Sequence, residues 1–334
     1  MIIKHLTILA SLFVVSLLFL AGTAKIPVSI EDEQSTAIIV TVPVKASTQS
    51  DISVNAPANT MFVSNTISND ISVIDTTSDA VLATIPVGTN PVGVATNSVT
   101  NLTYVANQDD STVTVIDGTT NSVTAIITGV DTPSGIAVNE VTNKVYVAEF
   151  ISGSVKVIDG STNAIIATIQ NIGNNPARIA VNPTTNKIYV TDVSTSQVFV
   201  IDGETNSVHA IMDSAITSPF GIGVNPNTNK IYVSNFQLGE GSVAAIDGLT
   251  DTVSAVVPFP SSAEPYYVAV NSSTNEVYVT NVVGGFVKII DGNTNTIVAN
   301  MASPASPVGI AALPSLHKIY VAETDASIVS VGLD

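Results

Sequence analysis

A four-residue pattern, an aromatic residue followed by Val, a small residue and a polar residue, recurs along this 334-residue chain. Seven copies occur at intervals of 42 to 46 residues: FVSN at 62–65, YVAN at 104–107, YVAE at 146–149, YVTD at 189–192, YVSN at 232–235, YVTN at 278–281 and YVAE at 320–323. Around each copy lie four short runs rich in Val, Ile and Tyr, separated by Asn, Pro, Gly, Asp and Thr, which is typical of strands joined by hairpins. Four strands at this period predict one propeller blade per repeat.

The number of strands also predicts how the ring closes. We expect an all-β fold over residues 36–334, a seven-bladed β-propeller of four-stranded antiparallel blades. The last repeat ends after its third strand, and the segment at 37–55 aligns without gaps on an outer strand, loop and inner strand at 164–182. The N-terminal strand, at about 37–44, should therefore complete the blade of the C-terminal strands, which removes an unpaired edge.

The tetrapeptides and the VIDG and NKIYV segments around them resemble the YVTN family of β-propeller repeats. The resemblance covers about residues 37–331 and implies an exported or surface-layer-associated propeller. Propellers carry many unrelated activities, so it implies the fold more firmly than the function.

The N-terminus indicates export. Lys4 and His5 precede an apolar run at 6–20 and the small residues AGTA at 21–24, so we expect a signal peptide at 1–24 and a short linker at 25–35. An uncleaved anchor is the alternative, although about 20 apolar residues are usually needed to cross a bilayer. We expect an extracellular, cell-surface or periplasm-like location and no stable membrane span after cleavage.

Composition narrows the function classes. A formal net charge of −17 disfavours nucleic acid as a partner. The chain has no Cys, no Trp and three His, so it lacks the residues of thiolate metal sites, histidine-rich copper centres and lyases with a catalytic histidine. We expect a non-catalytic binding or structural module whose partner is a cell-envelope protein, a glycan or a small anionic ligand. The alternative is a lactonase-like, divalent-metal-assisted hydrolase or lyase acting at the channel mouth.

Aspartates that end the third strand of each repeat are interpreted as turn residues. Asp159 in VIDGSTN has counterparts at Asp75, Asp117, Asp202, Asp247 and Asp291. Asp accepts hydrogen bonds from turn N–H groups, and the Asn or Asp before the next strand tolerates the left-handed conformation. The last repeat has Gly332 at this position and no following hairpin, which agrees with a turn function.

The candidate ligand site lies where the repeat is broken at the channel mouth. The residue just before the inner strand, or at its start, is Asp51, Gly93, Gly135, Arg178, Gly221, Tyr267 and Gly309 in turn. We expect the glycines to leave room that Arg178 and Tyr267 fill. Arg178 is the sole arginine and could hold a carboxylate or phosphate with two hydrogen bonds. Tyr266 and Phe220 would add aromatic surface. Alternatively, Arg178 forms an internal ion pair with Asp51 or Asp192.

Carboxylates on the same face provide weaker candidates. Glu149, Asp192 and Glu323 could bind Ca²⁺ through oxygen ligands, although no segment has the spacing of a calcium loop, and no other cofactor is expected. Glu149 and Asp192 are also included in the candidate ligand site. A solvated acidic rim is the alternative. Asn101 in NLT and Asn271 in NSS fit the N-glycosylation sequon.

Overall fold

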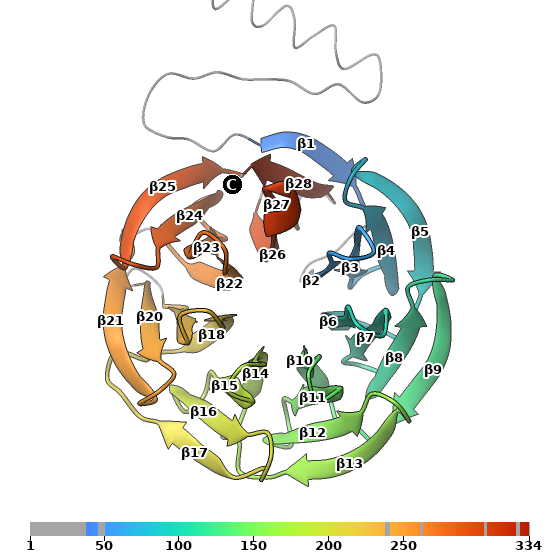
Figure 1. Ribbon diagram of the computed structural model, residues 1–334, viewed down its shortest axis with the longest axis horizontal. Helices are drawn as coiled ribbons and strands as arrows, with labels where there is room; N and C mark the ends of the chain where they lie inside the picture. The colour runs from blue at the N-terminus through green and yellow to red at the C-terminus, as the bar shows by residue number, and fades with distance from the viewer. Residues whose placement is uncertain are drawn as a thin grey trace, which may run out of the picture. The chain divides into compact units, whose positions relative to one another are not determined.

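Seven four-stranded antiparallel sheets surround a central axis in the part of the chain that the structure describes (Figure 1). The structure is a computed structural model that describes residues 38–45, 51–237, 241–260, 263–303, 306–324 and 328–333. The expected signal at 1–24 and linker at 25–35 lie outside these residues. No helix within these ranges is both long and apolar enough to cross a membrane.

Each sheet is one blade whose strands run from the axis outward. The innermost strands are β2 (Ile52–Asn55), β6 (Pro91–Asn97), β10 (Pro133–Asn139), β14 (Pro176–Asn182), β18 (Pro219–Asn225), β22 (Pro265–Asn271) and β26 (Pro307–Leu313). The second strands are β3 (Thr60–Asn65), β7 (Leu102–Asn107), β11 (Lys144–Glu149), β15 (Lys187–Asp192), β19 (Lys230–Asn235), β23 (Glu276–Asn281) and β27 (Lys318–Glu323). The third strands are β4 (Asp70–Asp75), β8 (Thr112–Asp117), β12 (Ser154–Asp159), β16 (Gln197–Asp202), β20 (Ser242–Asp247), β24 (Phe286–Asp291) and β28 (Ile328–Leu333). The outer strands are β1 (Ile38–Pro43), β5 (Ala80–Pro86), β9 (Ser122–Thr128), β13 (Ala164–Ile169), β17 (Val208–Ile211), β21 (Thr252–Pro258) and β25 (Thr296–Ala302).

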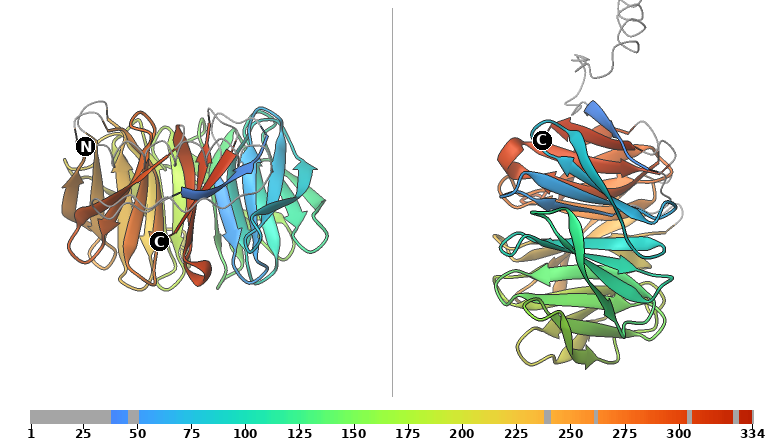
Figure 2. Two further views of the ribbon diagram at one scale, coloured as in Figure 1. Left: turned by 90° about the horizontal axis from the view of Figure 1, so that it is seen from above. Right: turned by 90° about the vertical axis from the view of Figure 1, so that its right-hand side faces the viewer.

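Burial along the strands follows their place in the ring. Second strands such as β11 are buried at five of six positions, whereas β13 alternates between exposed and partly buried residues. A second strand is covered on both faces by neighbouring blades, which explains its continuous Val, Ile and Tyr. An outer strand has one face in solvent and keeps the period of two. The turns between strands project from two opposite faces of the ring (Figure 2).

The ring closes where the two ends of the described chain pair. β1 pairs antiparallel with β28 in the sheet ordered β1-β28-β27-β26. β1 lies within the segment at about 37–44 that was expected to close the ring. One detail of the expected fold needs correction. The fold also contains one short 3-10 helix, η1 (Pro314–Leu316), since Pro314 favours the first position of a helical turn in the last blade's first hairpin.

The first residue of the tetrapeptide joins neighbouring blades. The six tyrosines and Phe62 at this position are fully buried. Tyr104 Oη donates to Gly160 O of the next blade at 3.4 Å, and Tyr232 Oη donates to Gly292 O at 3.4 Å. These aromatic residues therefore contact the next blade. Burial raises the pKa of Tyr146 and of Tyr232 to about 12, so these hydroxyls keep their protons at neutral pH.

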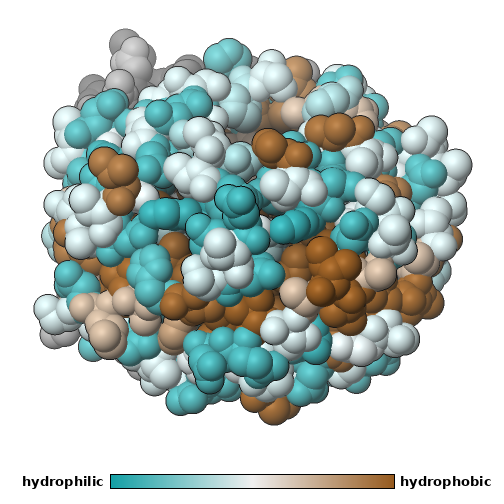
Figure 3. Space-filling model, turned by 60° about the horizontal axis from the view of Figure 1, so that its bottom comes forward, coloured by the Kyte–Doolittle hydropathy of each residue, from teal (hydrophilic) through white to brown (hydrophobic). Residues whose placement is uncertain are grey.

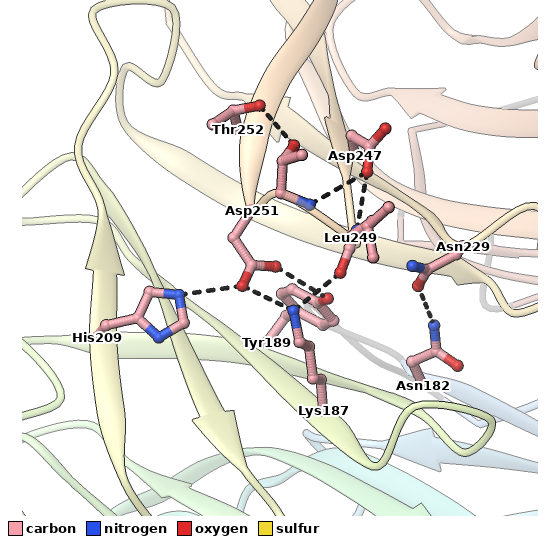
Figure 4. A network of polar contacts seen from close by, with 11 residues as sticks. Asn182, Lys187, Tyr189, His209, Asn229, Asp247, Leu249, Asp251 and Thr252 are labelled. Atoms are coloured by element: carbon pink, nitrogen blue, oxygen red, sulfur yellow. Dashed lines mark hydrogen bonds and ion pairs between the residues drawn. The ribbon is translucent and has the colours of Figure 1, made fainter.

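Lysines at the start of several second strands reinforce the same seams. Lys187 Nζ donates to Gly248 O at 2.8 Å and lies 2.7 Å from Asp251 Oδ2, both in the next blade (Figure 4). Asp251 also accepts from Tyr189 Oη at 3.4 Å and lies 3.1 Å from His209 Nε2. Lys318 makes the corresponding contacts with Thr76 O and Asp79, both at 2.7 Å, and so joins the last blade to the first.

Candidate channel-mouth site

Three inner strands bring the predicted mouth residues together. Arg178 is on β14, Phe220 on β18 and Tyr267 on β22, and Asp51 directly precedes β2. All four lie at the same end of the inner strands, which line the axis of the ring (Figure 1). Residues from four blades, up to 216 positions apart in sequence, therefore share one site.

Arg178 is enclosed by aromatic rings. Its Nη2 donates to Tyr267 Oη, and its Cζ lies 4.6 Å from the centre of the Tyr267 ring and 5.0 Å from that of Phe220. The residue is 8% exposed, and its buried Nε has no hydrogen-bond partner. A buried N–H without an acceptor costs about 1–3 kcal/mol, so this guanidinium has an unfilled binding capacity.

The alternative of an ion pair is wrong for Asp192, whereas Arg178 and Asp51 interact electrostatically without a direct ion-pair contact. Among the described residues no ion pair joins Arg178 to Asp51 or to Asp192. Asp51 instead accepts from Ile52 N at 2.9 Å and Val94 N at 3.2 Å, which holds its carboxylate on the backbone of two blades. Burial raises the pKa of Asp51, and the positive charge of Arg178 opposes this effect.

Tyr267 supplies a neutral hydroxyl to the site. Burial raises the pKa of Tyr267 well above its usual value, and this effect outweighs the opposing charge of Arg178. The hydroxyl therefore stays protonated at neutral pH. Because its oxygen accepts from Arg178, its own O–H can still donate to a further acceptor.

Aromatic side chains extend the site beyond Arg178. The rings of Phe220 and Tyr266 are stacked, with centres 4.2 Å apart and planes at 12°. Phe236 meets the edge of Tyr266 at 5.3 Å and is 37% exposed. Sequence reasoning named Tyr266 and Phe220 but missed Phe236. An aromatic residue directly after the YVSN tetrapeptide, in the longest repeat, was the available signal.

The glycines of the inner strands do not leave room at the mouth, contrary to expectation. A Cβ at Gly135 would lie 2.9 Å from Ala177 O, and one at Gly221 would meet Tyr266 O. Both distances are too short for a side chain. Glycine is needed because neighbouring inner strands approach each other closely at this level.

The predicted acidic ligands hold loops. Glu149 and Asp192, which end their second strands, are buried and accept from the preceding loop, Asp131 N at 2.7 Å and Asn174 N at 2.7 Å respectively. Glu323 accepts from Ser303 Oγ. The fourth residue of the tetrapeptide thus fixes the loop before its own blade's inner strand. No group of three or more His, Asp or Glu within the described ranges is arranged to hold a metal ion.

The repeated aspartates form the predicted turns. Asp159 Oδ1 accepts from Ser161 N at 2.8 Å and Thr162 N at 3.0 Å, and Asp202 accepts in the same way from Glu204 N and Thr205 N. Asn163, just before β13, has a φ of 57°, in the left-handed region. The turn interpretation is confirmed at these positions. The alignment of Gly332 with them is wrong, because Leu333 pairs with Lys318 as Asp159 pairs with Lys144.

Both sequon asparagines have structural contacts. Asn271 is 1% exposed, and its Oδ1 accepts from Ser273 N at 2.9 Å. Asn101 Oδ1 accepts from Asn55 Nδ2 of the preceding blade at 2.6 Å, and its Nδ2 donates to Thr119 Oγ1 at 3.0 Å. A glycan on Asn271 would have to attach to a side chain that is almost fully buried in the folded protein, and the use of both residues as glycosylation sites stays a prediction.

Comparisons with known proteins identify the fold class. No family model matches the chain, and no curated protein matches it. The YVTN resemblance therefore rests on the tetrapeptides and the VIDG and NKIYV segments around them. Solved structures with a similar fold include Kuenenia stuttgartiensis hydrazine synthase, with 17% identity, a TM-score of 0.74 and coverage of 94% of this chain and 98% of that one.

Two further structures are similar at lower identity. U3-55K has 13% identity and a TM-score of 0.76, with 88% of this chain and 98% of that chain covered. The WD40 repeats of RRP9 have 13% identity and a TM-score of 0.78, with 90% and 99% covered. At these identities the likeness shows the β-propeller fold and no activity.

Proposed function

We propose that the protein is an exported, non-catalytic propeller of the YVTN type that acts as a cell-surface or secreted binding module and holds an anionic group at its channel mouth. The observation that carries the proposal is that the buried Nε of Arg178 has no hydrogen-bond partner. The Nη2 of the same guanidinium donates to the neutral hydroxyl of Tyr267. A carboxylate can accept two parallel bonds from one edge of a guanidinium, and the Phe220 ring beside Arg178 is part of an aromatic cluster that includes the partly exposed Phe236.

Binding is favoured over the hydrolase alternative by the condition of the carboxylates. Glu149 and Asp192 accept backbone N–H groups of the loops that they hold, and Glu149 also lies 3.8 Å from Lys156 Nζ. Using either one as a metal ligand or base would release its loop. Arg178, in contrast, can bind an anion without breaking a loop contact.

The charge-removal variant Arg178→Gln tests the anion site. We expect acetate, benzoate or inorganic phosphate to bind the wild-type protein and to bind Arg178→Gln roughly 10- to 100-fold more weakly, the range for a lost charge-assisted hydrogen bond. Calorimetric titration measures the affinities. Lys156→Gln removes one positive charge from a third strand, outside the channel, and should leave binding unchanged.

Two results would contradict the anion site. One is equal affinity of wild type and Arg178→Gln for every anion that binds, and the other is no binding by the wild type. If Arg178→Gln fails to fold, Arg178→Lys replaces it, since Lys keeps the charge and loses the two-pronged geometry. The expectation for Arg178→Lys is weaker binding with an unchanged melting temperature.

Export has its own test. The proposed partners are cell-envelope proteins, glycans or small anions, which places the folded ring outside the cytoplasm. The leader at 1–24 supports this proposal. Sequencing the N-terminus of native protein from culture fluid and envelope fractions should find a chain that begins at Lys25. A full-length chain confined to the cytosol would contradict export.

A further inference from the structure

A groove on the outer rim separates the outer strands of two neighbouring blades, β13 and β17, which lie at the bottom of Figure 1. Its volume is about 550 Å³, within the range of about 300–1,000 Å³ usual for ligand sites. Figure 3 brings this side of the rim forward and shows apolar side chains gathered on it among polar ones. The groove is far from the channel mouth because it lies on outer strands.

The repeat is broken at this groove. β17 has four residues, whereas the other outer strands have six or seven. It pairs with β16 only over Val198–Ile201, whereas β13 pairs with β12 from Val155 to Asp159. The shortened strand leaves the blade incomplete beside the end of β13.

An aromatic residue lies in the groove at a position that is polar or small in the other blades. Phe199 of β16 pairs with Val190 of the neighbouring strand β15, and its side chain is 8% exposed. The residues at the same register in the other third strands are Ser72, Thr114, Lys156, Ala244, Lys288 and Ser330. Ile169 and Ala210 lie beside Phe199 in the lining. The groove therefore has an apolar floor in which Phe199 is the departure from the repeat, because Ile169 takes the same register position as Ile127 in the preceding blade.

Apart from Ala167 and Val208, the rest of the lining is polar, and its one acidic or basic side chain is a histidine. Its polar members are Thr168, Gln170, Asn171, Asn206 and His209. None of the ten lining residues is Asp, Glu, Lys or Arg, although the chain carries 27 acidic residues and 10 Lys plus Arg. Amide and hydroxyl side chains can both donate and accept hydrogen bonds. The lining suits a ligand that is uncharged and rich in hydroxyl groups.

We propose that this rim groove binds a neutral saccharide. The C–H face of a sugar ring packs on Phe199 and Ile169, and its hydroxyl groups bond to the amides of Gln170 and Asn171. An extended peptide fits less well, because strand addition needs a long regular edge and β17 offers four residues. The proposal does not depend on the anion site, which uses the inner strands and opposite chemistry, although Arg178 and Phe199 belong to the same blade.

Titration of the full chain with neutral trisaccharides of glucose, mannose and N-acetylglucosamine tests the groove. We expect at least one to bind and the double variant Gln170→Ala, Asn171→Gly to weaken its affinity by about three- to tenfold or more, the effect of losing neutral hydrogen bonds. Asn171→Gly keeps the backbone, because Asn171 has a φ of 64° and the equivalent residue of the preceding blade is Gly129, with a φ of 86°.

The control variant is Thr128→Ala, since Thr128 occupies the place of Gln170 in the preceding blade by register. It should leave saccharide affinity unchanged. Phe199→Ser, which installs the residue of the first blade, should abolish binding, and its melting curve shows whether the fold is kept. The proposal is overturned if no trisaccharide binds, if the double variant binds as well as wild type, or if acetyl-Val-Phe-Val-amide binds the groove and sugars do not.

Discussion

At the scale of single residues, the most repeated feature of the sequence is a hydrogen-bonding device. The aspartate that ends a third strand accepts two successive backbone N–H groups, as Asp159 does from Ser161 and Thr162. Such bonds favour the ionised carboxylate and lower its pKa. The pKa values of Asp159, Asp202 and Asp291 are lowered mainly by backbone hydrogen bonds, and that of Asp75 falls to about 2.

Asp75 gives these turns a measurable pH dependence. The Thr77 hydroxyl and the Ser78 N–H lower its pKa from 3.8 to about 2, so the unfolded chain takes up this proton at higher pH than the folded one. Its contribution to stability is therefore complete above about pH 4 and is lost as the pH falls towards 2. Asp75→Asn should be less stable than wild type at pH 6 in urea unfolding, and the difference should shrink at pH 2.5.

The control for Asp75 is Glu204→Gln. This variant neutralises an exposed carboxylate in the corresponding turn of another blade. It should not alter the pH profile. A difference between wild type and Asp75→Asn that is constant from pH 6 to pH 2.5 would refute the assignment. A carbon-detected NMR titration of Asp75 measures its pKa directly.

Residues whose function is local could be predicted, and those that act across the ring could not. The turn aspartates and left-handed asparagines bond within a few positions of themselves, so sequence spacing suffices. Arg178 was found because it breaks a repeat. The alternative ion pair with Asp192 was wrong, because the sequence does not show that loop amides already occupy this carboxylate. The function of Glu149 in holding a loop was likewise hidden, since its partner Asp131 belongs to a different segment.

At the scale of strands, period and position in the blade follow from the repeat, whereas exact lengths do not. β1 ends at Pro43 and β17 has four residues, details that depend on which backbone groups find partners in three dimensions. The inner strands show the same limit. Glycine at 135 appeared to leave space, but it reflects the close approach of β10 to β14. A repeat alignment predicts where a strand lies better than what touches it.

At the scale of the whole molecule, stability depends on a ring whose last seam joins distant parts of the chain. Val42 of β1 is 2% exposed and packs in one cluster with Tyr320 and Val329. At the same seam, Lys318 and Tyr320 contact Asp79 and Thr76 of the first blade. Opening this seam would expose apolar blade faces and unpaired strand edges together.

Closure can be tested by making one chemical change at two seams. Lys318→Met leaves Asp79, whose side chain is 7% exposed, without its ammonium partner. Lys187→Met leaves Asp251 with His209 still 3.1 Å away. Removing one partner of a buried pair costs up to about 3–5 kcal/mol. We expect Lys318→Met to lower the melting temperature more than Lys187→Met.

Deletion of 38–43 tests the closing strand itself. We expect it to lower the melting temperature by at least about 5 °C, because β28 then lacks its outer neighbour. Thermal unfolding followed by circular dichroism measures all three variants. Equal effects of the two lysine variants, together with an unchanged melting temperature after the deletion, would show that the β1 seam does not limit stability.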